Sequence, residues 1–398
     1  MAELHFVYIR LILCVYILPS SAVSDLKLVH VLFAHKLYAS WEDAKMNETN
    51  IPETLSYESF ISASMNIPVT GKFNMYNLGV YLRETYDEFL GNVYMSDIMK
   101  TRTTEHSLSI LSAQLVHAGL WPPTKNQMWN ENLNWQPIPF EYLELKEDTL
   151  MLGFLCPNFI SQMNQILQTI QTQKMLAQHQ SLFHHLSKYT ERNISTPSDV
   201  ALLYATLETL ADQNYMLPNW AINVFPDGTM YNVTLLEYDL LSTTPLQKQL
   251  NGGTFLEEII GNSLKYIIGD ISKKQKMMLY SGNVRNIVGV LKNLNLWSPH
   301  IPNEAAALIF ELYFNNDTNT YGIKINYYTG IDDMIIVLSL PNCTEICPLN
   351  TLINATINLI PRNSQSLCGW FTENLTEDLS GKMDSSNCNE AISYQTNM

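Results

Sequence analysis

Cationic side chains are scarce in this chain. Lysine and arginine together number 23, against 38 aspartates and glutamates, so the formal net charge is −15. Nucleic acids and anionic membrane surfaces attract cationic proteins, so this balance argues against both as partners. An enzyme that binds phosphate remains compatible with it, provided that arginines gather locally at the site.

Motifs that identify several common enzyme classes are also absent. The sequence holds no glycine-rich phosphate loop, no Gly-x-Ser-x-Gly elbow, no zinc signature and no internal repeat. We therefore expect neither a cofactor nor a metal ion.

Long apolar runs are confined to the N-terminus. Residues 1–22 have the pattern of a signal peptide, in which an apolar block from Phe6 to Leu18 precedes Pro19 and small residues. Arg10 interrupts this block, so an amphipathic anchor is the alternative. No later run is long enough to span a bilayer, and the polar tail at 371–398 carries no anchor signal. We expect a secreted protein without a membrane anchor.

Cysteines are few, and an odd number remains once the signal peptide and its Cys14 are removed. Cys343 and Cys347 are spaced like half of a metal site, but no second Cys or His pair lies nearby. In a secreted chain, a disulfide is the stronger expectation for this pair. The other remaining cysteines are Cys156, Cys368 and Cys388.

Asn-x-Ser/Thr sequons are abundant. Each alone is a common chance match, but such sites accept glycan in secreted proteins. Together they support secretion and predict glycosylation at Asn47, Asn193, Asn232, Asn316, Asn342, Asn354 and Asn374.

The chain is long enough to bury a large core. It has 398 residues, 46% of them hydrophobic, which predicts one large domain with an insertion, or two domains. An apolar run from Leu26 to Phe33 is typical of a strand buried in a parallel sheet. Ligands of open α/β sheets bind at the carboxyl ends of strands, so His35 would lie at the mouth of a site. A histidine there is more often a hydrogen-bonded structural residue than a nucleophile.

Strands and helices are expected on both sides of a helical insertion. Apolar residues recur at helical spacing over 75–89 and 108–116, and a short strand is expected at Val93–Met95. Residues 156–249 carry helical stripes and few strand candidates. We therefore expect a helical cap at 156–249, inserted into a discontinuous α/β core formed by 23–155 and 250–370. Further strands are expected at 276–280, 309–314, 321–328 and 334–340, and the last three suggest an antiparallel edge.

Several stretches of the chain resemble the histidine acid phosphatases, which include prostatic and lysosomal acid phosphatase and the acid phosphatases of insect venoms. The resemblance is carried by residues 26–35, 112–123, 135–139, 252–253, 279–281 and 311–314. Its Pro122-Pro123 and Trp135-Gln136-Pro137-Ile138-Pro139 segments are most similar to the insect proteins. It implies a mixed-sheet α/β sandwich, similar to that of the phosphoglycerate mutases, with an inserted helical cap.

The resemblance also implies a chemistry. In the family, the first strand ends in Arg-His-Gly-x-Arg-x-Pro, whose histidine attacks phosphorus to form a phosphohistidine while the two arginines hold phosphate oxygens. A third arginine begins the helix after Arg-Ser-Thr-Asp. A His-Asp pair after Tyr-Ser-Ala completes the site, and its aspartate protonates the departing alcohol.

This chain keeps the nucleophile position and departs from the rest of the first motif. His35 occupies the place of the attacking histidine. Ala34 and Tyr38 stand where the family has its first two arginines, and Lys36 replaces the glycine. Ser40 stands in place of the proline.

The other two catalytic motifs are replaced as well. Leu108 stands where the third arginine belongs, although Arg102 matches the start of that motif. Asn283 and Val284 replace the His-Asp pair. The losses are large, because a general acid contributes roughly 10²–10⁴ in rate and a transition-state arginine about 10³–10⁵. One lysine does not replace bidentate arginines.

The resemblance therefore predicts a catalytically impaired pseudophosphatase of salivary or venom type. Such a protein would act by binding an unknown protein or small-molecule ligand. The alternative is an acid phosphatase that hydrolyses phosphate monoesters through a phosphohistidine on His35, with Arg102 and Arg285 as possible ligand contacts.

The resemblance extends to the cysteines. It implies one disulfide between Cys156 and Cys368 and another between Cys343 and Cys347. The family's third pair is replaced here by Thr209 and Ala307. Cys388 stays unassigned, either free or joined to another chain, and a homodimer like those of relatives is an open alternative to a monomer.

Overall fold

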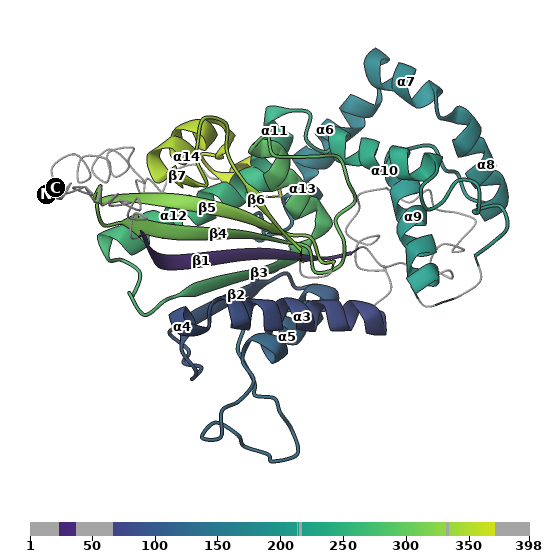
Figure 1. The fold of residues 1–398 in the computed structure, drawn as a ribbon. Helices are drawn as coiled ribbons and strands as arrows, with labels where there is room; N and C mark the ends of the chain where they lie inside the picture. The colour runs from purple at the N-terminus through teal and green to yellow at the C-terminus, as the bar shows by residue number, and fades with distance from the viewer. Residues whose placement is uncertain (1–23, 37–66, 213, 215–216, 332–333, 371–398) are drawn as a thin grey trace, which may run out of the picture.

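The computed structural model describes residues 24–36, 67–212, 214, 217–331 and 334–370, and Figure 1 shows their arrangement. Within these ranges, no helix is both long enough and apolar enough to cross a membrane. Several predicted features lie outside the described residues: the signal peptide at 1–22, the tail at 371–398, Tyr38, Ser40, Asn47, Asn374 and Cys388.

A seven-stranded mixed sheet forms the centre of the molecule, with its main strands in the order β2-β3-β1-β4-β5-β6. β1 runs parallel to β3 and antiparallel to β4, so the parallel setting predicted for the first strand is correct on one side only. β4, β5 and β6 form the predicted antiparallel edge. The strands are β1 (Ser24–His35), β2 (Met99–Thr103), β3 (Met277–Asn283), β4 (Ala307–Asn315), β5 (Thr320–Tyr328), β6 (Ile335–Leu338) and β7 (Ile346–Pro348), which pairs with β5.

The apolar run of β1 is explained by packing on both faces of the sheet. Its last eight residues are buried. Leu28 and Leu32 belong to one apolar core, whereas Val29 and Phe33 belong to the other. Because successive side chains of a strand point to opposite faces, a strand between two cores must be apolar at nearly every position.

Helices cover each face of the sheet (Figure 1). α3 (Val69–Thr85) and α5 (Ser107–Leu120) pack together on the side of Val29 and Phe33. α12 (Thr254–Ile268) and α13 (Val284–Asn293) contribute to the core on the side of Leu28 and Leu32. This arrangement confirms the predicted mixed α/β sandwich. Shorter helices are α4 (Asp87–Leu90), α14 (Leu349–Thr356) and α15 (Ser364–Cys368).

The strand predicted at Val93–Met95 is wrong. Val93 and Met95 are 47% and 54% exposed and belong to no strand. The strand of this region is β2, which buries Met99, Thr101 and Thr103 on alternate positions. β2 buries two threonines and exposes Lys100, so its sequence is less apolar than the segment that holds Val93 and Met95. The apolar pattern therefore favours a strand at the wrong segment.

The regular structure that is described within residues 156–249, which we call the helical segment, consists of helices. In Figure 1 its helices α8 and α9 lie beyond the carboxyl end of β1. The division of the chain into a core and a cap stays a prediction. The helices are α6 (Pro157–Leu167), α7 (Ile170–Ala177), α8 (Gln180–Thr190), α9 (Pro197–Asp212), α10 (Thr229–Leu240) and α11 (Pro245–Lys248).

Candidate functional site

The carboxyl ends of β1 and β3 lie side by side. The register of these parallel strands pairs His35 with Asn283 and Ala34 with Gly282. Asn283 then caps α13, because its side-chain oxygen accepts a hydrogen bond of 2.9 Å from the backbone N–H of Arg285. The topology therefore gathers the predicted site positions of the first and third motifs at one edge of the sheet.

The ring of His35 has a defined tautomer. Its Nδ1 lies 2.7 Å from the carbonyl oxygen of Lys36, which can only accept, so Nδ1 carries the proton and Nε2 carries the lone pair. Nε2 lies 3.2 Å from Oγ of Ser109, and Thr104 donates to that oxygen at 2.8 Å. The Ser109 hydroxyl proton is thus directed to Nε2. The lone pair that a nucleophilic histidine would use is engaged within the chain.

The environment keeps His35 neutral. Burial is the main cause that lowers its pKa to about 4, and the nearby His106 adds to this effect. The two rings are stacked, with centroids 6.1 Å apart. His106 also caps α5, since its Nδ1 accepts from the backbone N–H of Leu108 at 3.3 Å. Sequence reasoning missed His106 and Ser109, although both lie within one turn of the start of a predicted helix.

A small cavity separates this sheet edge from helices α9 and α10. Its volume is about 40 Å³, which gives room for on the order of three water molecules. The lining residues that matter here are His35, Lys36, Asn283, Val284 and Arg285 from the sheet edge, with Tyr204, Glu208, Glu237 and Tyr238 from the two helices.

Lys36 is held by carboxylates. Its Nζ lies 2.8 Å from Oε1 of Glu208 on α9, and its backbone N–H donates to Glu304 at 2.9 Å. Burial acts to lower the pKa of Lys36, but the charges of Glu208, Asp212 and Glu304 outweigh it and raise the pKa. The ammonium group therefore stays charged and is already paired.

Arg285 is held in the same way. Its Nη2 lies 2.7 Å from Oε1 of Glu237 on α10, a residue that is 1% exposed, and its guanidinium lies over the ring of Phe154. Burial acts to lower the pKa of Arg285, but the charge of Glu237 more than offsets it and raises the pKa. Lys36, which replaces the family's glycine, and Arg285, which was predicted as a possible ligand contact, thus each pair with a glutamate of the helical segment.

Arg102 is not among the residues that line the cavity. Its Nη2 lies 3.1 Å from Oδ1 of the buried Asp148. Burial raises the pKa of Asp148 to about 6, against the opposing effect of Arg102. Arg102 is therefore held in an ion pair with Asp148 outside the cavity lining.

Small or apolar side chains occupy three further replaced positions within the described residues. Ala34 and Leu108 are fully buried, and Leu108 packs with Ile67. Val284 is 8% exposed and lines the cavity. Nothing at these three positions can donate a hydrogen bond from its side chain to a phosphate oxygen.

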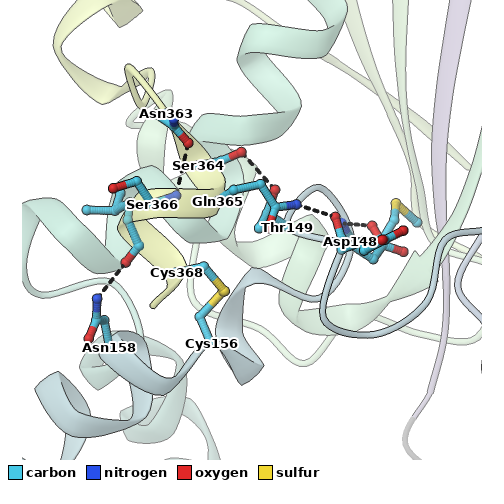
Figure 2. Close-up of a disulfide and its surroundings, with 12 residues drawn as sticks. Asp148, Thr149, Cys156, Asn158, Asn363, Ser364, Gln365, Ser366 and Cys368 are labelled. Atoms are coloured by element: carbon cyan, nitrogen blue, oxygen red, sulfur yellow. Dashed lines mark hydrogen bonds between the residues drawn. A yellow bond between two sulfur atoms is a disulfide. The ribbon is translucent and has the colours of Figure 1, made fainter. Parts of the chain in front are cut away.

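Both implied disulfides are present. Cys156 and Cys368 join the start of α6 to α15 across 212 residues, and Cys343 and Cys347 close a short loop. Figure 2 shows the first of these among side-chain hydrogen bonds, including one from Asn158 to the Leu367 carbonyl and one from Thr149 to Ser364.

Within the described residues, no group of three or more His, Cys, Asp or Glu side chains could hold a metal ion.

Five of the predicted glycosylation sites lie within the described residues. Their asparagines are exposed, as glycosylation requires: Asn193, Asn232, Asn316, Asn342 and Asn354.

Comparison with known proteins gives consistent matches. The family model of the histidine phosphatase superfamily (branch 2) matches residues 33–327. Venom acid phosphatase Acph-1 of Apis mellifera is 35% identical over 347 residues, which cover 87% of this chain and 88% of that protein. Prostatic acid phosphatase of Homo sapiens is 27% identical over 366 residues, which cover 90% of each protein. A solved structure of Hafnia alvei phytase, at 16% identity, covers 87% of this chain and 98% of its own with a TM-score of 0.62, and shows the shared fold.

Proposed function

This chain belongs to branch 2 of the histidine phosphatase superfamily, and on that premise we propose that it is a catalytically impaired acid phosphatase-like protein that acts by binding. The pairing of the cavity's cations carries the proposal. Lys36 and Arg285 each hold a glutamate of the helical segment, at 2.8 and 2.7 Å. A phosphate monoester would have to compete with these carboxylates for both cations.

The lack of an acid for the leaving group also supports the proposal. Asn283 and Val284 have no acidic proton to transfer. The glutamates among the described lining residues, Glu208 and Glu237, are each engaged in an ion pair with a cation of the sheet edge. A departing alkoxide would therefore leave without a proton from the protein, at a cost of roughly 10²–10⁴ in rate.

We further propose that the protein is secreted and glycosylated. The relative of highest identity named above is a venom protein. Two disulfides and five exposed sequon asparagines suit an oxidising, glycosylating compartment. The ligand would be a protein or a small molecule that does not depend on a phosphate group.

One observation favours the second candidate, an acid phosphatase that works through His35. The hydrogen bond between Nδ1 and the Lys36 carbonyl gives His35 the tautomer whose Nε2 could attack phosphorus. In that case the Ser109 hydroxyl would have to release Nε2 when substrate binds.

An assay with an aryl phosphate at acid pH separates the two candidates. We expect the purified chain to be at least about 10³-fold slower than the Apis mellifera venom acid phosphatase assayed in parallel. We also expect His35→Ala to leave the residual rate unchanged, because that rate would not depend on a phosphohistidine. Turnover that disappears in a folded His35→Ala variant would establish the phosphatase instead.

A further inference from the structure

We propose that Glu208 and Glu237 are the residues that set the ligand selectivity of this cavity, because they occupy its cations from within the chain and exclude oxyanions. The proposal rests on the proposed loss of phosphate hydrolysis and deepens it: the replaced catalytic residues would explain slow chemistry, whereas these two glutamates would prevent anion binding.

Both ion pairs cross the cavity. The cations come from the sheet edge, Lys36 directly after β1 and Arg285 at the start of α13. The carboxylates come from α9 and α10 of the helical segment. All four residues line the cavity, so the pairs lie in the space that a ligand would enter rather than on a distant surface.

The local charge is unfavourable for an anion. Lys36 and Arg285 are the cations among the described lining residues, and Glu208 and Glu237 balance them. Asp212 and Glu304 also act on Lys36, which adds negative charge beside the pair. At an effective dielectric constant of about 20, one unit charge about 5 Å from another changes an affinity by roughly a hundredfold. An incoming oxyanion would meet this repulsion.

The carboxylate groups of Glu208 and Glu237 take the charge partners that an oxyanion would need in this cavity. Removal of their charge is therefore expected to open a binding site for an oxyanion at Lys36 and Arg285.

A third ion pair between the same two parts of the chain offers a matched control. Lys292 of α13 pairs with Asp239 of α10, two residues beyond Glu237. The Asp239 side chain is 58% exposed, and the pair does not belong to the cavity lining. Its removal should alter the contact between the helices without changing the charge of the cavity.

The test is the binding of inorganic phosphate and tungstate to the full chain, measured by thermal shift and by calorimetry. The variants are Glu208→Gln, Glu237→Gln and the double variant, since glutamine keeps the shape and the accepting oxygen but not the charge. We expect no saturable binding to the unmodified chain and an affinity at least about tenfold higher in the double variant. Asp239→Asn should show no gain.

The outcomes separate this proposal from the proposed function. A folded double variant without any gain overturns the selectivity proposal, as does saturable phosphate binding by the unmodified chain. Glu237→Gln leaves a buried arginine without its charge partner, so if that variant fails to fold, Glu208→Gln alone must show the gain, because Glu208 is partly exposed. His35-dependent hydrolysis by the unmodified chain would contradict the proposed function, whatever the variants bind.

Discussion

Buried histidines link the stability of this protein to pH. Burial lowers the pKa of His30 to about 3 and of His35 and His117 to about 4, from an ordinary value of 6.5. The unfolded chain therefore takes up these protons before the folded chain does, and stability falls as the pH decreases from about 6.5 toward 4. Asp148 has the opposite effect on stability. Burial raises its pKa to about 6, so the folded chain takes up this proton first, which offsets part of the loss of stability between about pH 6 and 4.

A substitution at His117 is expected to make the fold less sensitive to acid. His117 is buried on α5 and bonds Thr101 at 2.8 Å, away from the cavity. His117→Gln removes one acid-linked loss, which we estimate at roughly 3 kcal/mol at pH 4. Thermal unfolding at several pH values should show a shallower decline below pH 6.5 than in the unmodified chain. The exposed His184→Gln serves as the control, and equal slopes in both variants would contradict the assignment.

The site residues at the sheet edge could be predicted from the sequence, whereas those on α9 and α10 could not. His35 and Asn283 end strands with apolar patterns, and Val284 follows the second strand, so their meeting at one edge could be foreseen from the resemblance and the topology of open sheets. Glu208 and Glu237 could not be foreseen. They belong to helices that are distant in sequence from β1 and α13. The periodicity of a helix does not show which of its carboxylates will pair with a cation from another part of the chain.

At the scale of elements, α3 and α5 approach each other through glycines. A Cβ atom at Gly79 would lie 2.2 Å from the carbonyl oxygen of Val116, and one at Gly119 would lie 2.2 Å from that of Tyr76. Two helix backbones come this close only where a side chain is missing. The apolar spacing predicted both helices, whereas their close crossing depends on contacts that periodicity does not encode.

Alanine at one of these glycines should therefore be costly. We expect Gly79→Ala to lower the free energy of unfolding by about 1–3 kcal/mol, because the helices must separate. Gly261→Ala is the matched control, since Gly261 lies in α12 with no atom within 4 Å of an added Cβ. That substitution should stabilise by about 0.5–1 kcal/mol. Denaturant unfolding measures both, and similar effects of the two variants would argue against the close crossing.

At the scale of the whole molecule, the disulfide between Cys156 and Cys368 connects the start of the helical segment to the end of the described chain (Figure 2). It closes a loop across 212 residues, which includes β3 to β7 and the helical segment. A long loop gives a disulfide a large effect on the entropy of the unfolded chain.

Removal of this disulfide should destabilise more than removal of the short one. We expect the Cys156→Ser/Cys368→Ser variant to lose about 2–5 kcal/mol of unfolding free energy. The Cys343→Ser/Cys347→Ser variant should lose less, because its cysteines are separated by only 4 residues. Denaturant unfolding of the two double variants checks the order, and a reversed order would show that the strain or packing of the short loop dominates.

The two ion pairs across the cavity also bear on how this chain could change over evolutionary time. Arginine reintroduced at position 34 or 108 would leave the two cations of the cavity paired with Glu208 and Glu237, so a phosphate group would still have to displace these carboxylates. A return to phosphate chemistry would thus require coordinated substitutions in the sheet edge and in α9 and α10, with little benefit from any one of them. Such epistasis makes the loss of activity easier to acquire than to reverse.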